Sequence, residues 1–251
     1  MKRLRNILNV SDISLTLAVL AMIAVVIPIW IILKLVNTRN LQGEPSTYDA
    51  YILISVMVVW LYVLSFVLFY LLYIQKYDMN ASIVIRRKTV RRVWLNSQGN
   101  MAVTILFYTV YVTIVTGILG MLLTGKVCNW NEKYSRVYMS TGYVAENPPP
   151  FWLFILAFMI NVFAVLYVSG TIMMFIWWLT DMQWIGFIAA IAIATAENLI
   201  GKGYMTVRCR LNFGMYKNGV SVFENIVYPL ALCIAVSFIT TLIIRRKDFL
   251  K

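Results

Sequence analysis

The chain has 251 residues, of which 61% are hydrophobic and 13% charged, with a mean hydropathy of +0.79 and a net charge of +12. Soluble globular proteins have about 45–50% apolar and about 25% charged residues. The composition therefore excludes an ordinary soluble domain, because the excess apolar side chains need lipid as their solvent. The basic residues lie mainly between apolar stretches, a pattern that orients membrane proteins and argues against nucleic acid as a partner.

Six segments are long and apolar enough to cross a membrane: residues 13–36, 51–74, 101–123, 151–179, 182–200 and 226–244. Crossing a hydrocarbon core of about 30 Å takes roughly 20 apolar residues in a helix. We therefore predict an all-α membrane protein with a single transmembrane domain over residues 1–251. The first segment is longer than the apolar region of a signal peptide, so we interpret it as a retained span.

The charge distribution predicts the topology of these six spans. The side that holds both termini and residues 75–100 carries thirteen basic and four acidic residues, and the other side carries nine basic and six acidic residues. The positive-inside rule then places both termini in the cytoplasm. Residues 2–12 mix basic and apolar side chains, which fits either an amphipathic helix on the membrane surface or a solvated leader.

The sequence offers no candidate for catalysis or metal binding. Histidine is absent, and Cys128, Cys209 and Cys233 form no CxxC pair. We expect no catalytic residue, no metal site and no directly bound cofactor, and we expect Cys128 and Cys209 to stay unbonded. Residues 120–127, GMLLTGKV, match part of a phosphate-loop motif, but Val127 stands where that motif needs Ser or Thr.

Few polar side chains lie inside the predicted spans. Asn161 is the main one in the fourth span, and a helix-packing hydrogen bond is its expected role, with a substrate contact as the alternative. The second span is free of charge and rich in aromatic residues, including Trp60 and Phe66. These would suit an amphipathic or lipid-like substrate, although any lipid-facing helix can carry them. Trp60, Phe66 and Asn161 are therefore the candidate pathway residues.

The stretch SIVIRRKTVRRVWLNSQ, residues 82–98, concentrates five of the twenty-two Lys and Arg residues. As a helix over residues 82–97 it would place its apolar side chains along one edge and its arginines on another. Such a helix can bind anionic lipid headgroups, or it can dock its apolar edge into a groove of a partner protein. The apolar edge consists of Ile83, Val90, Val93 and Trp94.

The whole chain resembles the membrane subunit of a type-2 ABC transporter, the ABC-2 permease family. The resemblance rests on the six spans, the N-terminal segment, the basic loop between spans two and three, and the tail. Its most family-like residues are RRKTVRRVW (86–94) and IIRRKDF (243–249). The turn at Thr180–Asp181 departs from the pattern, because it lacks the positive charge expected of a cytoplasmic loop.

This resemblance implies that two kinds of subunit carry out different parts of the function. A separate ATPase binds ATP and Mg²⁺, while this chain is no enzyme and forms a pathway with a second copy or a sister subunit. A cytoplasmic coupling helix between spans two and three rests in a cleft of the ATPase. The residues carried over to that helix are Ile83, Arg86, Arg87, Val90, Arg91 and Trp94.

The expected function is export of an amphipathic peptide or another hydrophobic molecule across a bacterial cell membrane, with membrane lipid around the spans. The alternative is a multi-pass membrane scaffold or channel that works without an ATPase. Residues 201–225 are expected to form the short outer-leaflet helices that the family places ahead of its last span.

Overall fold

The computed structural model describes residues 23, 26–31, 33–34, 44–55, 90–135, 138–139, 142–144, 148–200, 209, 211 and 226–244. Within these residues the regular secondary structure is helical, apart from one isolated bridge between Glu44 and Ser135, which confirms the all-α class. The helices are α3 (Thr47–Ser55), α6 (Val90–Thr124), α8 (Phe151–Thr180), α9 (Gln183–Ile200) and α10 (Tyr228–Ile244). The predictions for residues 2–12, Trp60, Phe66, Ile83, Arg86 and Arg87 fall outside the described residues.

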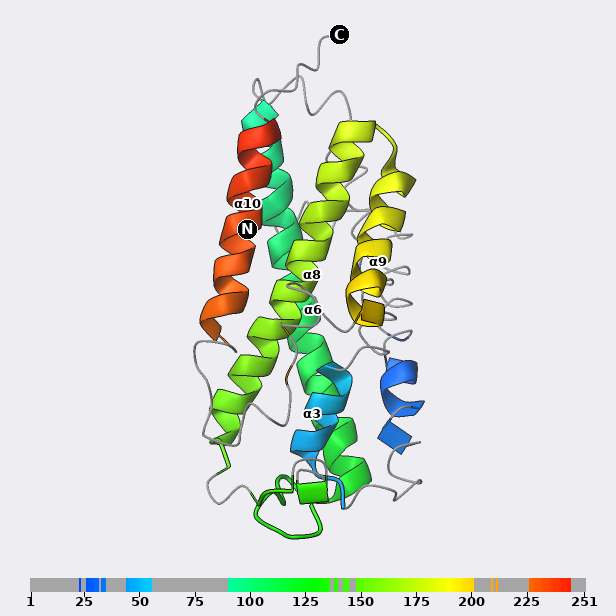
Figure 1. Cartoon of the computed structure of the whole chain (residues 1–251), viewed down its shortest axis with the longest axis vertical. Helices are drawn as coiled ribbons and strands as arrows, with labels where there is room; N and C mark the ends of the chain where they lie inside the picture. Colours follow the sequence, from blue (N-terminus) through cyan, green and yellow to red (C-terminus); the bar gives the residue numbers. More distant parts are fainter. Residues whose placement is uncertain are drawn as a thin grey trace.

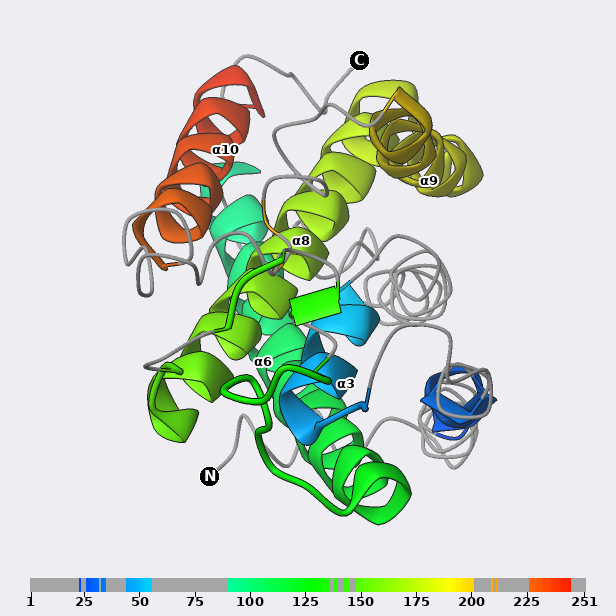
Figure 2. The same ribbon diagram turned by 60° about the horizontal axis from the view of Figure 1, so that its bottom comes forward.

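Helix α8 is the centre of the bundle (Figure 1). It contacts α6, α9 and α10, and α3 packs mainly against the second half of α6. Figure 2 shows α10 beside the start of α6 and α9 folded back along the end of α8. Ile29 and Leu33, from the first predicted span, are buried in the same core as residues of α3, α6 and α8.

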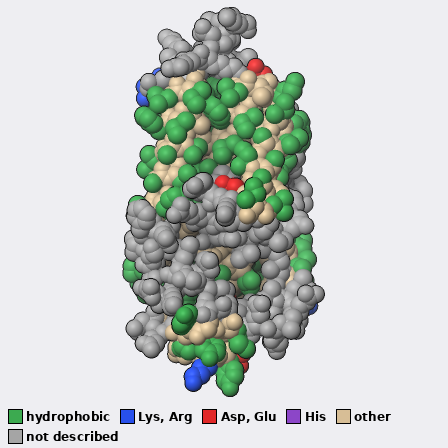
Figure 3. All heavy atoms as spheres, in the orientation of Figure 1, with side chains coloured by type: hydrophobic (Ala, Val, Ile, Leu, Met, Phe, Trp, Pro, Cys, Tyr) green, Lys and Arg blue, Asp and Glu red, His purple; other side chains and the backbone are tan. Residues whose placement is uncertain are grey.

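Two of the described helices are long and apolar enough to cross a membrane, namely Arg91–Thr124 and Phe151–Thr180. Gln183–Glu197 and Tyr228–Ile244 are apolar but shorter. The outward faces of all four are hydrophobic, as the space-filling view shows for α8, α9 and α10 (Figure 3). Large apolar side chains that are more than half exposed include Leu106, Phe107, Ile188, Ile234 and Phe238.

Helices α8 and α9 form a tight hairpin. Asp181 adopts a left-handed conformation with φ of 58°, and its N–H donates to the Trp177 carbonyl at 2.8 Å, which ends α8. Helix α9 then presents Gly186, Ala190 and Ala194 at intervals of four residues, and all three are buried. A Cβ at Gly186 would collide with the carbonyl oxygen of Met173, so this crossing depends on small side chains.

Helix α3 begins with a capping box. The Asp49 N–H donates to Ser46 Oγ at 3.4 Å, and the Ser46 N–H donates to Asp49 Oδ2 at 2.7 Å. Ser46 Oγ also donates to Asp49 Oδ2 at 2.8 Å, and Trp130 Nε1 donates to Asp49 Oδ1 at 3.0 Å. This cap starts α3 at Thr47, earlier than the predicted start of the second span at Tyr51.

The loop after α6 completes this end of the bundle. Gly125, with φ of 67°, ends α6, so residues 120–127 comprise the last turn of a helix and the loop after it, and helix rather than strand directly precedes them. The N–H of Thr47 donates to the Lys126 carbonyl at 2.9 Å, and the Tyr48 ring stacks on Phe154 with centroids 4.4 Å apart. We call residues 44–49 together with residues 126–135 the Asp49 cap.

Candidate functional site

The described part of the predicted coupling helix is the start of α6. Helix α6 has 35 residues and runs without a break from Val90 to Thr124. The sequence predicts a helix that ends at Ser97, and this end is wrong, because α6 continues through Met101, where the third span is predicted to begin. The basic first turns of α6 and its apolar remainder from Met101 onward therefore form one continuous helix.

Contacts with other helices keep α6 helical where its sequence favours a break. The residues NSQGN, 96–100, have low helix propensity, and Gly alone costs about 1 kcal/mol relative to Ala. However, Ser97 and Gln98 are buried, and Gln98 Nε2 donates to Thr240 Oγ1 of α10 at 3.5 Å. Packing on α10 therefore overrides the local preference.

Two residues of the apolar edge, Val93 and Trp94, face the protein itself. Val93 and Trp94 are fully buried, and the Trp94 ring meets Trp178 of α8 edge-on with centroids 5.2 Å apart. Met174 and Ile244 complete the group, which we call the tryptophan cluster: Val93, Trp94, Met174, Trp178 and Ile244. The predicted coupling residue Trp94 thus joins α6 to the last turns of α8 and α10, and its ring is not available on the surface.

The basic edge of the same helix start faces outward. Arg91 and Arg92 are exposed, and among the described residues neither guanidinium makes a hydrogen bond or an ion pair. The predicted coupling residue Val90 is the first residue of α6. The structure therefore places exposed positive charge next to a buried aromatic contact at one end of the bundle.

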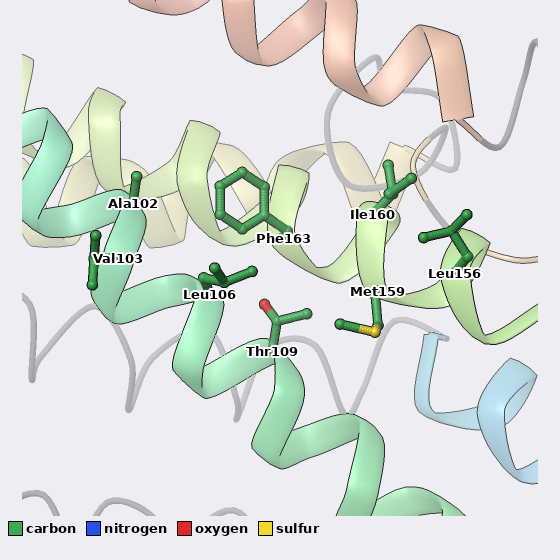
Figure 4. A pocket seen from close by; sticks show the side chains of 8 residues that line it. All are labelled: Ala102, Val103, Leu106, Thr109, Leu156, Met159, Ile160 and Phe163. Atoms are coloured by element: carbon green, nitrogen blue, oxygen red, sulfur yellow. The ribbon is translucent and has the colours of Figure 1, made fainter.

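An apolar groove lies between α6 and α8 further along the bundle (Figure 4). It has a volume of about 380 Å³, and α6 and α8 contribute four lining residues each. The side chains that line it are Ala102, Val103, Leu106, Thr109, Leu156, Met159, Ile160 and Phe163. Thr109 supplies its one hydroxyl, which is fully buried and has no hydrogen-bond partner in the described structure.

The candidate pathway residue Asn161 lies apart from this groove. It is buried in α8, and its Nδ2 donates to the Ala157 carbonyl one turn earlier at 2.7 Å. This hydrogen bond stays within α8 rather than joining two helices, so the packing role and the substrate contact expected for Asn161 both stay predictions. The groove itself was not anticipated, since its residues come from two spans whose relative rotation the sequence does not reveal.

The ionisable groups of the Asp49 cap are joined by ion pairs and hydrogen bonds. Lys126 Nζ donates to Glu44 Oε2 at 2.7 Å and to Glu132 Oε2 at 3.3 Å, and these bonds raise the pKa of Lys126. Burial raises the pKa of the Cys128 thiol. Cys128, Cys209 and Cys233 are free, and no cluster of three potential metal ligands occurs within the described ranges.

Comparison of the chain with protein-family models, with curated proteins and with solved structures finds no match. The functional argument therefore rests on the geometry above. One feature missed from the sequence had a visible signal: Ser46 followed three residues later by Asp49 is a capping-box spacing.

Proposed function

We propose that this chain is the membrane-spanning subunit of an ATP-driven exporter of the type-2 ABC kind, located in the cell membrane. In this proposal six helices cross the bilayer and both termini lie on the side of the tryptophan cluster. A separate ATPase binds the basic segment around residues 83–94 and moves α6, and a second copy or a sister subunit completes the pathway. The substrate is an amphipathic peptide or another hydrophobic molecule.

The exposed apolar faces support the placement in a membrane. Along α8, residues 151–180, there is no charged side chain, yet Trp152 and Leu179 near its two ends are more than half exposed. Such a surface is stable in lipid and costly in water. Tryptophans are enriched at membrane interfaces, which agrees with the exposed Trp152 at the start of α8 and the exposed Trp184 at the start of α9.

The continuity of α6 carries the proposal of coupling. At about 1.5 Å per residue, its 35 residues extend for about 52 Å, well beyond a hydrocarbon core of about 30 Å. A displacement imposed near Arg91 is therefore transmitted along the helix without a flexible joint. The contact between Trp94 and Trp178 passes the same displacement to α8.

The test is ATPase binding by the full chain. The variant Arg87→Glu with Arg91→Glu reverses two charges near the proposed docking surface, whereas Lys133→Glu reverses an exposed charge in the Asp49 cap. The protein and its variants are purified in mild detergent from the native host, and co-eluting ATPase is measured by mass spectrometry and by ATP hydrolysis.

We expect the double variant to insert in the membrane but to lose the ATPase, and Lys133→Glu to keep it. Retention of the ATPase by the double variant would contradict docking at the start of α6. Absence of any ATPase from the unaltered protein would favour a scaffold or channel that works alone.

A further inference from the structure

One stripe on α6 connects the two exposed arginines to the apolar groove. Arg91, Leu95, Gly99, Ala102 and Leu106 follow one another at steps of four, four, three and four residues, which keeps them on one face of the helix. We propose that this stripe and the groove bind one anionic phospholipid, with its phosphate at Arg91 and Arg92 and the end of one acyl chain between α6 and α8. The inference rests on the proposed crossing of a membrane by α6.

The headgroup end of this site is defined by charge. Arg91 and Arg92 are exposed, and neither has a hydrogen-bond or ionic partner among the described residues. A guanidinium binds phosphate oxygens with two parallel hydrogen bonds, which makes a phosphate the best-matched ligand for this pair. Both residues lie beside the tryptophan cluster, at the level where the proposal places the membrane interface.

The strip between the arginines and the groove is open. Leu95 is 45% exposed, and Gly99 has no atom within 4 Å of the position that a Cβ would occupy. The polar neighbours Ser97 and Gln98 turn into the bundle, and Asn96 and Asn100 at the sides of the strip are half-buried. An acyl chain can therefore lie along α6 over Leu95, Gly99 and Ala102.

The length of the strip matches one leaflet of a bilayer. Ala102 follows Arg91 by eleven residues, which is about 16 Å along a helix axis at 1.5 Å per residue. Half of a hydrocarbon core of about 30 Å is about 15 Å. A lipid held at Arg91 would therefore bring the end of its acyl chain to the mouth of the groove.

The groove fits hydrocarbon better than a polar molecule. Its lining is apolar apart from Thr109, and the Thr109 hydroxyl is buried in the wall. Thr113, one turn further along, donates its hydroxyl to the Thr109 carbonyl at 2.7 Å, whereas the Thr109 hydroxyl makes no such bond in the described structure. An acyl chain requires nothing from this hydroxyl, so Thr109→Val should not weaken binding.

The experiment uses the full chain in nanodiscs that contain equal amounts of phosphatidylglycerol and phosphatidylcholine. Each lipid in turn carries a photoactivatable diazirine at the end of one acyl chain, and adducts are counted by intact mass and mapped by proteolysis. We expect one phosphatidylglycerol adduct within residues 102–109 or 156–163, about tenfold in excess over phosphatidylcholine, which corresponds to one strong charged interaction.

Variants separate the two ends of the site. Arg91→Gln with Arg92→Gln should remove the preference for phosphatidylglycerol, and Ala102→Trp should remove the adduct by filling the groove. Ile114→Trp, on an exposed face of α6 outside the groove, is the matched control and should change neither. Thermal midpoints of all variants show whether each one is folded.

The outcomes distinguish this inference from the proposed function. Equal labelling by the two lipids, adducts scattered over exposed helix faces, or an unchanged adduct in Ala102→Trp would overturn the lipid site, as would its loss in Thr109→Val. Loss of the adduct in Ala102→Trp with unchanged ATPase binding would support it. Failure of the unaltered chain to enter the membrane would instead contradict the proposed function.

Discussion

The two ends of the bundle are held together by different interactions. At the Asp49 cap, the Asp49 carboxyl group accepts hydrogen bonds from Ser46 and Trp130, and backbone bonds join the start of α3 to the loop after α6. At the tryptophan cluster, α6, α8 and α10 meet mainly through apolar and aromatic contacts, with two exposed arginines beside them.

This difference indicates which end can move. Hydrogen bonds weaken steeply when their length and angle change, so the Asp49 cap holds its elements in one arrangement. Apolar contacts are not directional, and the hydrogen bond from Gln98 to Thr240 beside the tryptophan cluster is long, at 3.5 Å, so a small displacement at this end costs less than one at the Asp49 cap. The proposed ATPase would thus act on the end of α6 that tolerates movement, while the other end stays fixed.

The largest expected effect is at the tryptophan cluster. Trp94→Ala removes a fully buried ring and should lower the free energy of unfolding by about 3–5 kcal/mol. Trp152→Ala removes an exposed ring near the Asp49 cap, at the other end of the bundle, and should change stability by less than about 0.5 kcal/mol. Thermal midpoints in one detergent compare the two, and equal losses would contradict the packing described for Trp94.

A smaller loss is expected at the Asp49 cap. Asp49→Asn places an amide where Ser46 and Trp130 both donate hydrogen bonds, and should cost about 2–3 kcal/mol. Glu132→Gln alters an exposed ion pair and should leave the thermal midpoint unchanged. If both variants lowered the thermal midpoint by the same small amount, the hydrogen bonds of Asp49 would not be what stabilises the cap.

The sequence predicts the helices of this fold better than their contacts. The fourth span was placed at residues 151–179 and α8 covers Phe151–Thr180, because a long apolar run follows the prolines at 148–150. The boundary predicted after Ser97 was wrong, because burial of Ser97 and Gln98 against other helices is a tertiary effect. No periodic pattern relates Trp94 to Trp178, so the central contact of the candidate site was invisible before the structure.

Two glycines, one tightly packed in the α8–α9 hairpin and one exposed on α6, separate the effect of close packing from that of helix propensity. Gly186→Ala brings a methyl group against the backbone of Met173 and should cost about 1–3 kcal/mol. Gly99→Ala adds the same methyl group where nothing lies within 4 Å, and should stabilise α6 by up to about 1 kcal/mol. Opposite signs of the shift in thermal midpoint are the expected result, and a shared sign would show that helix propensity dominates at both positions.

The smallest effect concerns Cys128, which reports on the packing of the Asp49 cap. Burial raises the pKa of this thiol, and the Asp49 and Glu132 carboxyls raise it further, against a lowering by a hydrogen bond with the Trp130 backbone. Since the thiolate is the reactive form, alkylation of Cys128 at pH 8 should be slower than that of an exposed cysteine, and its rate should rise at a higher pH. Peptide mapping by mass spectrometry separates Cys128 from the buried Cys209 and Cys233.

The variant Asp49→Asn should loosen the cap and remove one negative charge near Cys128. Both changes should lower the pKa of the Cys128 thiol and speed its alkylation. An unchanged alkylation rate in Asp49→Asn would show that Asp49 affects neither the burial of Cys128 nor the electrostatic potential at its thiol.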